Sequence, residues 1–251
     1  MPGAPRFFCP APLATGLHLA LSPAAARHAQ VLRLQPGAAI TLFGHRDTTT
    51  PGGEFAATVT AMGRNNVQVL VGPHDPVERE TARRLHLAIG IPANERMDWL
   101  VETATDRGVA SIQPLMTERS VVRLDEQRSV KKQAHWHSIV VAACEQSGRN
   151  QVASVHMPMA LTQWLRKAPT PSTTTEATLV LSLQPGTSPL SQWRNGPGTA
   201  ARCIAFLCGP EGGLSATEEA QAAAAGFTPV SLGERTLRSE TAALAALTLL
   251  A

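Results

Sequence analysis

Apolar residues are spaced in two different ways along the chain. In the first 72 residues, short apolar runs are separated by turn-forming pieces such as Gly63-Arg64-Asn65-Asn66. This spacing predicts short strands that form a small β-barrel. One helix is predicted among them, over residues 23–33, because Ser22 is a good N-cap and Pro23 suits the first helical position. The expected strands are 17–21, 39–43, 54–60 and 67–71.

After a proline-rich joint at residues 72–76, strand-like runs alternate with segments whose apolar residues recur every three or four positions. This alternation is typical of an α/β domain with a largely parallel sheet. The expected strands are 85–91, 111–116, 179–183, 203–208 and 228–232. The expected helices are 94–107, 128–146, 160–167, 215–225 and a last one from Ser239. Segments 168–176 and 192–199 are expected to be loops, and we expect two domains, residues 1–72 and 77–251.

Glycine-containing loops follow the last two predicted strands. Gly209-Pro210-Glu211-Gly212-Gly213 leads into a helix with a capping box made by Ser215 and Glu218, and Gly226 is its predicted C′ residue. The second loop spans residues 233–239. In parallel α/β sheets such strand ends form a crevice for a small ligand. Loops that only turn the chain are the plain alternative, and a phosphate loop is another, although the Lys-Ser/Thr of a P-loop is absent.

Composition excludes several classes of protein. The residues are 43% hydrophobic and 16% charged, as in an ordinary globular protein. No apolar run approaches the roughly 20 residues of a membrane helix, so we expect no membrane association. The N-terminal residues lack the pattern of a signal peptide, and the four cysteines are scattered. We therefore expect a cytoplasmic protein with reduced thiols.

The charged residues leave RNA binding open and argue against a metal. A formal charge of +3 is too small to indicate a nucleic-acid partner by itself. The positive residues are almost entirely Arg, which suits phosphate and base contacts. His135 and His137 lie about 200° apart on a helix, so they cannot share an ion, and no metal is expected.

The two glycine-containing loops resemble the signature loops of the SPOUT RNA methyltransferases, and more narrowly those of the ribosomal RNA small subunit methyltransferase E family. Further segments match that family: Arg6-Phe7-Phe8, the stretch from His28 to Arg33, Glu118-Arg119-Ser120 and Glu145-Gln146-Ser147-Gly148-Arg149-Asn150. The resemblance implies an enzyme that methylates N3 of a uridine in 16S rRNA with S-adenosylmethionine. It also implies a PUA-like β-barrel domain followed by a SPOUT domain with a trefoil knot, and a homodimer.

The same resemblance implies site residues. Arg238 is the expected catalytic residue that stabilises charge on the uracil. Glu240 is expected to accept the proton or to orient Arg238, and the alternative is that it only favours the dipole of the last helix. Backbone groups of the two loops and of a third loop, after strand 179–183, are expected to bind the cofactor. The expected cofactor-binding residues are Leu181, Ser182, Leu183, Leu207, Gly209, Pro210, Glu211, Gly212, Gly213, Leu232, Gly233, Leu237, Thr241 and Ala242.

Six residues are expected to contact the RNA of 16S rRNA or the small ribosomal subunit: Arg6, His28, Arg33, Arg119, Arg149 and Asn150. Solvated helix positions for His28 and Arg33, and a plain helix end at Gly148, remain the alternatives. Thr103, Asp106 and Arg107 depart from the family pattern. Two other functions stay open: a SPOUT methyltransferase acting on another RNA such as tRNA, and an RNA-binding protein without catalysis.

Overall fold

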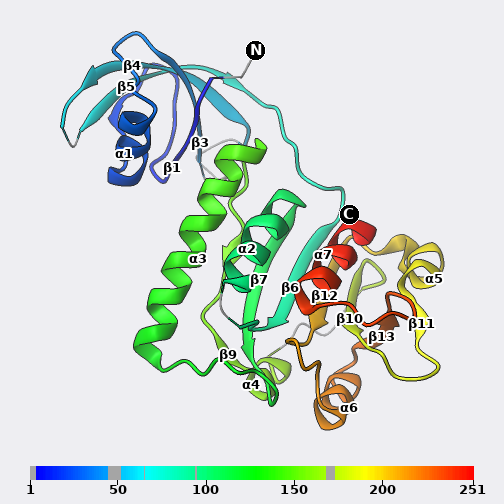
Figure 1. The fold of residues 1–251 in the computed structure, drawn as a ribbon. Helices are drawn as coiled ribbons and strands as arrows, with labels where there is room; N and C mark the ends of the chain where they lie inside the picture. Colours follow the sequence, from blue (N-terminus) through cyan, green and yellow to red (C-terminus); the bar gives the residue numbers. More distant parts are fainter. Residues whose placement is uncertain (1–3, 45–51, 65, 94, 168–172) are drawn as a thin grey trace. The chain divides into compact units, whose positions relative to one another are not determined.

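A computed structural model describes residues 4–44, 52–64, 66–93, 95–167 and 173–251 (Figure 1). The chain forms two compact units, Met1–Glu80 with Val141–Val152, and Thr81–Val140 with Ala153–Ala251. The predicted division at residues 72–76 places all of 77–251 in the second domain. The structure differs, because Val141–Val152 packs with the N-terminal residues, and residues 72–75 of the predicted joint continue a strand.

The first unit contains a sheet, one helix that follows its second strand, and residues 141–147 at the end of a long helix. Among the described residues its strands are β1 (Arg6–Cys9), β2 (His18–Ala20), β3 (Ala39–Gly44), β4 (Glu54–Met62) and β5 (Val67–Asp75). Their order is β1-β3-β4-β5-β2, with β1 and β3 parallel and the other pairs antiparallel. Phe7, Leu42 and Val69 of the sheet are fully buried, in one core cluster with alanines of the helix. No pairing in the described part of the chain joins β1 to β2, so closure into a barrel stays a prediction.

Helix α1 (Pro23–Val31) begins as the sequence predicts. The Ser22 hydroxyl accepts a hydrogen bond from the Ala25 amide at 3.2 Å, and Pro23 occupies the first turn. The helix is two residues shorter than predicted, because Leu32 is its C-cap and Arg33 has a positive φ of 55°. That left-handed angle is unusual for a residue with a side chain and ends the helix.

The second unit is an α/β domain with a parallel sheet. Its strands are β6 (Arg84–Gly90), β7 (Val109–Met116), β8 (Ser154–Val155), β9 (Met159–Ala160), β10 (Glu176–Leu181), β11 (Ser188–Pro189), β12 (Cys203–Cys208) and β13 (Thr228–Ser231). The order is β11-β13-β10-β12-β6-β7-β8, with β9 also beside β7, and every pair is parallel. The predicted α/β class with a largely parallel sheet is therefore confirmed.

Helices lie on both faces of this sheet (Figure 1). They are α2 (Arg96–Asp106), α3 (Glu126–Ser147, of which residues 141–147 belong to the first unit), α4 (Leu161–Leu165), α5 (Leu190–Asn195), α6 (Ala216–Ala224) and α7 (Ser239–Leu250), with a 3-10 turn at Pro197–Ala200. Helices α4 and α6 cover Ala88, Val180 and Leu207. Helix α7 contacts α2, α5, β6 and β12. In the described residues, no helix is long and apolar enough to cross a membrane.

Short elements account for most differences from the prediction. Segment 192–199 was expected to be loop, yet it contains most of α5 and the 3-10 turn. Helix α5 follows Pro189 and buries Leu190 and Trp193. A helix of six residues has too few positions to show an apolar period, so packing decides its structure. Part of the predicted loop 168–176 lies outside the described residues, and Glu176 begins β10.

Candidate functional site

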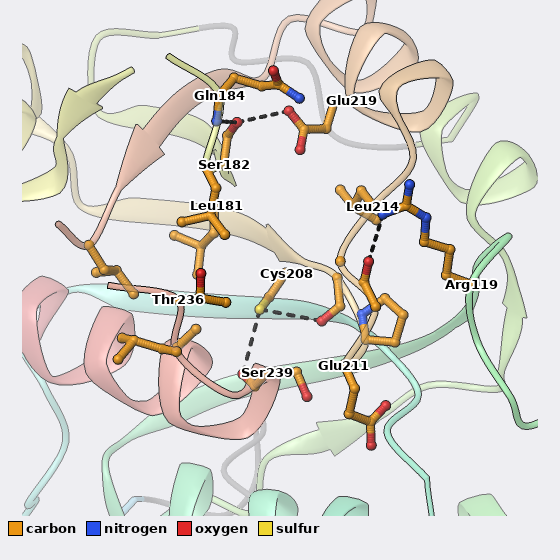
Figure 2. A pocket seen from close by; sticks show the side chains of 18 of the residues that line it. Arg119, Leu181, Ser182, Gln184, Cys208, Glu211, Leu214, Glu219, Thr236 and Ser239 are labelled. Atoms are coloured by element: carbon orange, nitrogen blue, oxygen red, sulfur yellow. Dashed lines mark hydrogen bonds between the residues drawn. The ribbon is translucent and has the colours of Figure 1, made fainter. Parts of the chain in front are cut away.

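A cavity of about 320 Å³ lies where three neighbouring parallel strands, β13, β10 and β12, end (Figure 2). Because the strands are parallel, the loops that follow them meet at one edge of the sheet. The lining residues are Arg119, Leu181, Ser182, Leu183, Gln184, Cys208, Gly209, Pro210, Glu211, Gly212, Gly213, Leu214, Glu219, Val230, Leu232, Gly233, Arg235, Thr236, Leu237, Ser239 and Ala242.

The loop after β12 is a tight turn that depends on its glycines. The Gly213 amide donates to the Pro210 carbonyl at 2.8 Å, and Gly213 has a φ of +68°. A Cβ on Gly209 would lie 2.7 Å from the Gly213 carbonyl carbon and 2.7 Å from the Leu214 nitrogen. Such distances leave no room for a side chain at Gly209, so the backbone of this turn packs on itself.

The capping box predicted after this turn is present. The Ser215 hydroxyl accepts from the Glu218 amide at 3.2 Å, and the Glu218 carboxylate accepts from the Ser215 amide at 2.9 Å. At the other end of α6, Gly226 has a φ of +89° and its amide donates to Ala223, while Phe227 donates to Ala222. These two bonds form a Schellman motif, as the glycine position predicts.

Side chains hold the 209–213 turn from two directions. The Glu211 carboxylate accepts from the Ala93 amide at 2.8 Å and from Arg96 Nη1 at 3.2 Å. On the other side, Arg119 Nη1 donates to the Gly212 carbonyl at 2.7 Å. The Glu218 carboxylate also accepts from the Glu118 amide at 2.8 Å, which fixes the segment that carries Arg119. Glu211, the acidic residue inside the glycine-rich turn, therefore ties the turn to Ala93 and Arg96.

The loop after β10 forms a polar end of the cavity. The Ser182 amide donates to the Val230 carbonyl at 3.0 Å, which joins the ends of β10 and β13. Its hydroxyl donates to Glu219 Oε2 at 2.8 Å and accepts from the Gln184 amide at 3.1 Å. Figure 2 shows the Glu219 and Gln184 side chains close to Ser182 at one end of the pocket, away from Ser239.

The loop after β13 leads into α7. Gly233 has a φ of +107°, and Arg238 is the N-cap of α7 without a side-chain capping bond. The Arg238 side chain is exposed and is not among the residues that line the cavity, although its neighbours Leu237 and Ser239 are. Arg235 lines the cavity directly. The loop therefore carries two arginines: Arg235 lines the cavity, and Arg238 lies in the chain between two residues that line it.

Glu240 is enclosed in the protein. Its side chain is 6% exposed, and its carboxylate accepts from the Ser239 hydroxyl at 3.1 Å. The buried Cys208 thiol donates to the carbonyls of Gly209 and Ser239 at 3.6 Å. Burial, together with the Glu240 charge, raises the pKa of Cys208 to about 12. In the described residues no ion pair joins Glu240 to Arg238, and an orienting role for Glu240 stays a prediction.

The cavity contains most of the residues that the sequence analysis assigned to cofactor binding. Leu207 and Thr241 are the exceptions: Leu207 is fully buried, and Thr241 points to the exposed side of α7. The sequence analysis missed several residues of the lining, and it placed Arg119 with the RNA contacts. The missed residues are Gln184, Cys208, Leu214, Glu219, Val230, Arg235, Thr236 and Ser239.

Two of the predicted RNA contacts are buried within the first unit. Arg149 is 3% exposed and Asn150 is 2% exposed. Arg149 Nη2 donates to Glu80 at 2.6 Å, with Nε 3.2 Å from both carboxylate oxygens. Asn150 donates to the Val77 carbonyl and accepts from Arg6, both at 2.7 Å. Both side chains are enclosed and hold the unit together in this structure, and their role as phosphate contacts stays a prediction.

The other predicted RNA residues of the first unit differ in exposure. Arg6 is largely buried, pairs with Glu54 and lies over the Phe43 ring at 4.9 Å. His28 Nδ1 lies 3.2 Å from the Glu145 carboxylate. Arg33 is exposed. Among the described residues, no cluster of His, Cys, Asp or Glu suits a metal ion.

Known proteins resemble this chain over nearly its whole length. The RNA methyltransferase domain model matches residues 79–251. Ribosomal RNA small subunit methyltransferase E of Bacillus subtilis is 30% identical, over 78% of this chain and 76% of that protein.

This chain belongs to the ribosomal RNA small subunit methyltransferase E family. A solved family member from Neisseria gonorrhoeae, bound to S-adenosyl methionine, is 34% identical with a TM-score of 0.85 over 98% of this chain and 95% of that one. A putative methyltransferase from Legionella pneumophila, in complex with the same cofactor, is 36% identical with a TM-score of 0.88 over 99% and 97% of the two chains. The predicted family is therefore confirmed.

Proposed function

We propose that this protein uses S-adenosylmethionine to methylate N3 of a uridine in 16S rRNA. The observation that carries the proposal is the cavity at the ends of β13, β10 and β12, which both glycine-containing loops line. Family membership supports S-adenosylmethionine as the methyl donor, because two similar structures hold this cofactor. The N3 position and the 16S target come from the family resemblance.

The residues of the cavity suit this cofactor. Its volume of about 320 Å³ lies at the lower end of the range of small-molecule sites, roughly 300–1,000 Å³. Leu181, Leu214, Val230 and Leu237 supply an apolar wall for a flat base. Gly209 and Gly213 keep backbone N–H and C=O groups of the tight turn near the surface of the cavity. We propose that these leucines and loop backbones hold the adenosine.

When bound, the cofactor supplies a methyl group on a positively charged sulfur. The chain must hold the uracil in line with it and stabilise negative charge on the uracil oxygens as the N3 proton leaves. Arg238, exposed between the lining residues Leu237 and Ser239, is the proposed group for this second task. Arg235 is the other cation of the same loop, and it lines the cavity.

The burial of Glu240 changes its proposed role. A carboxylate that is 6% exposed and already bonded to Ser239 is not placed to take a proton from an entering uracil. It lies in the first turn of α7, where negative charge is favourable near the helix N-terminus. We propose that Glu240 fixes the start of α7, and with it the position of Arg238.

We propose that the first unit is a PUA-like domain that binds RNA, with Arg33 as an exposed cation. We propose that Arg119, which belongs to the second unit and lines the cavity, also contacts RNA. A trefoil knot is supported by the position of α7: β13 lies beyond β10, yet α7, which follows it, contacts α2, β6 and β12. We further propose a homodimer in the cytoplasm.

The proposal is tested by methyl transfer in vitro. Purified protein and S-adenosylmethionine labelled in its methyl group are mixed with 16S rRNA, with assembled small subunits, or with tRNA. Label in N3-methyluridine of 16S rRNA, found by nucleoside mass spectrometry, is the expected result. Label in tRNA would identify a different RNA target, and cofactor binding without transfer to any RNA would contradict the proposed activity.

A further inference from the structure

Glu219 is a carboxylate at the cavity that the sequence analysis did not single out. It lies in the first turn of α6 and is half-buried. Its Oε2 accepts the Ser182 hydroxyl at 2.8 Å, and Figure 2 shows the carboxylate directed toward Ser182 and Gln184. This places an acidic group at the polar end of the pocket.

The cavity has one other carboxylate in its lining, and the two differ in their partners. Glu211 pairs with Arg96 and accepts from the Ala93 amide. In Figure 2 its carboxylate points away from Ser182 and Glu219. Among the ion pairs of the described residues, none involves Glu219. Glu219 therefore brings a negative charge to the cavity, and no cation of the described residues forms an ion pair with it.

Ser182 fixes the direction of this carboxylate. The serine is 5% exposed, and its hydroxyl is used twice, as donor to Glu219 and as acceptor from the Gln184 amide. Its backbone is tied to β13 through the Val230 carbonyl. Because Ser182 is held at three points, it fixes the place of Glu219 Oε2. In the part of the chain that the structure describes, no hydrogen bond is made by Glu219 Oε1, which leaves this oxygen for a ligand.

We infer that Glu219 recognises a hydrogen-bond donor of the cofactor, and that it thereby sets which end of the cofactor lies at Ser182. The inference rests on the proposed function. A carboxylate accepts from ammonium or hydroxyl donors and repels another carboxylate. Of the donors of S-adenosylmethionine, the adenine amino group goes with the base to the proposed apolar wall, which leaves the ammonium of the methionine part and the ribose hydroxyls for Glu219. Either satisfies Glu219, and the cofactor's own carboxylate is directed elsewhere.

A structural reading of Glu219 makes a different prediction. In the first turn of a helix an acidic side chain is stabilised by the helix dipole. If Glu219 served α6 alone, its replacement would lower thermal stability and leave cofactor affinity unchanged. The two readings are therefore separated by measuring both quantities on the same variants.

The test is isothermal titration of the full chain with three ligands. S-adenosylmethionine carries both donor groups, S-adenosylhomocysteine keeps them without the sulfonium charge, and 5′-methylthioadenosine keeps the ribose but lacks the ammonium. The variants are Glu219→Gln, which keeps the shape, and Glu219→Ala. Glu234→Gln, in the loop after β13 but outside the lining, is the control for loss of one negative charge.

Glu219→Gln and Glu219→Ala should weaken binding of S-adenosylmethionine about 10- to 100-fold, the range for a hydrogen bond to a charged group. Glu234→Gln should change it less than about twofold. If the ammonium is the partner, S-adenosylhomocysteine binding weakens equally and 5′-methylthioadenosine binding is unchanged. If the ribose is the partner, all three ligands lose affinity. Unchanged affinity of both Glu219 variants for all three ligands overturns the inference.

The same titrations keep this inference separate from the proposed function. Tight binding of S-adenosylmethionine by the wild-type protein, with unaltered Glu219 variants, would refute the role of Glu219 and leave the methyltransferase assignment standing. Absence of binding to the wild-type protein would refute both.

Discussion

The turn at residues 209–213 allows a sharp prediction, because two of its glycines differ in what a side chain would meet. A Cβ on Gly209 would lie 2.7 Å from Gly213 C, 2.7 Å from Leu214 N and 2.9 Å from Gly213 Cα. All three are backbone atoms of the same turn. A Cβ on Gly212 would meet the Arg119 side chain, at 3.2 Å from its Cβ. Gly209→Ala must therefore widen the turn, because the neighbouring atoms are backbone. Gly212→Ala requires only that the Arg119 side chain shift by a few tenths of an ångström.

The magnitude follows from the cost of overpacking. Forcing a methyl group into a filled space costs about 1–3 kcal/mol. If that cost is met by distorting the lining of the cavity, S-adenosylmethionine affinity falls roughly 5- to 150-fold in Gly209→Ala. Gly212→Ala should lose less than about fivefold, since its neighbour belongs to an exposed side chain. Calorimetric titration gives both affinities, and a thermal melt shows whether each variant is folded.

The comparison between the two alanine variants decides the matter. If Gly209→Ala binds the cofactor as the wild type does, the packing of this turn does not shape the cavity. If Gly212→Ala is the weaker binder of the two, the cofactor itself passes over Gly212, and the role of Arg119 in filling that space is refuted.

Three other predictions follow from buried or exposed charges. Arg149→Ala leaves Glu80 without its partner, so the free energy of unfolding measured with urea should fall by about 3–5 kcal/mol. If Arg149 were instead only a phosphate contact, the variant would lose RNA affinity and keep its stability. Arg238→Ala should lower kcat about 10²–10³-fold with KM for RNA unchanged, and a raised KM with normal kcat would make Arg238 an RNA anchor. Burial lowers the pKa of His86 below its usual 6.5. Near pH 6.5 the unfolded chain therefore binds more protons than the folded chain, so the free energy of unfolding falls as the pH drops through 6.5. His86→Gln should make this free energy depend less on pH, as urea unfolding at several pH values would show.

The loops of the site were predictable because local sequence determines them. Short apolar runs followed by glycine predict strand ends with tight turns, and the structure places Cys208 and Gly209 at such a point. The start of α6 also follows from local signals, since Ser215 and Glu218 are three residues apart and cap each other. Local signals of this kind survive folding because their partners lie within one turn of chain.

Contacts between distant residues were not predictable in the same way. Arg149 resembles a surface arginine in the sequence, and its partner Glu80 lies 69 residues earlier. Glu219 has the same difficulty: its place at the cavity depends on Ser182, which is 37 residues away on another strand. One sequence signal was available for Glu211, since an acidic residue inside a glycine-rich turn calls for a partner, and the structure supplies Arg96 and Ala93.

The most direct measurement is mass spectrometry of nucleosides from 16S rRNA, prepared from cells with and without this protein. The account predicts that one N3-methyluridine is lost when the protein is absent, returns with the wild-type gene, and does not return with the Gly209→Ala gene. An unchanged amount of N3-methyluridine in 16S rRNA from cells without the protein would contradict it.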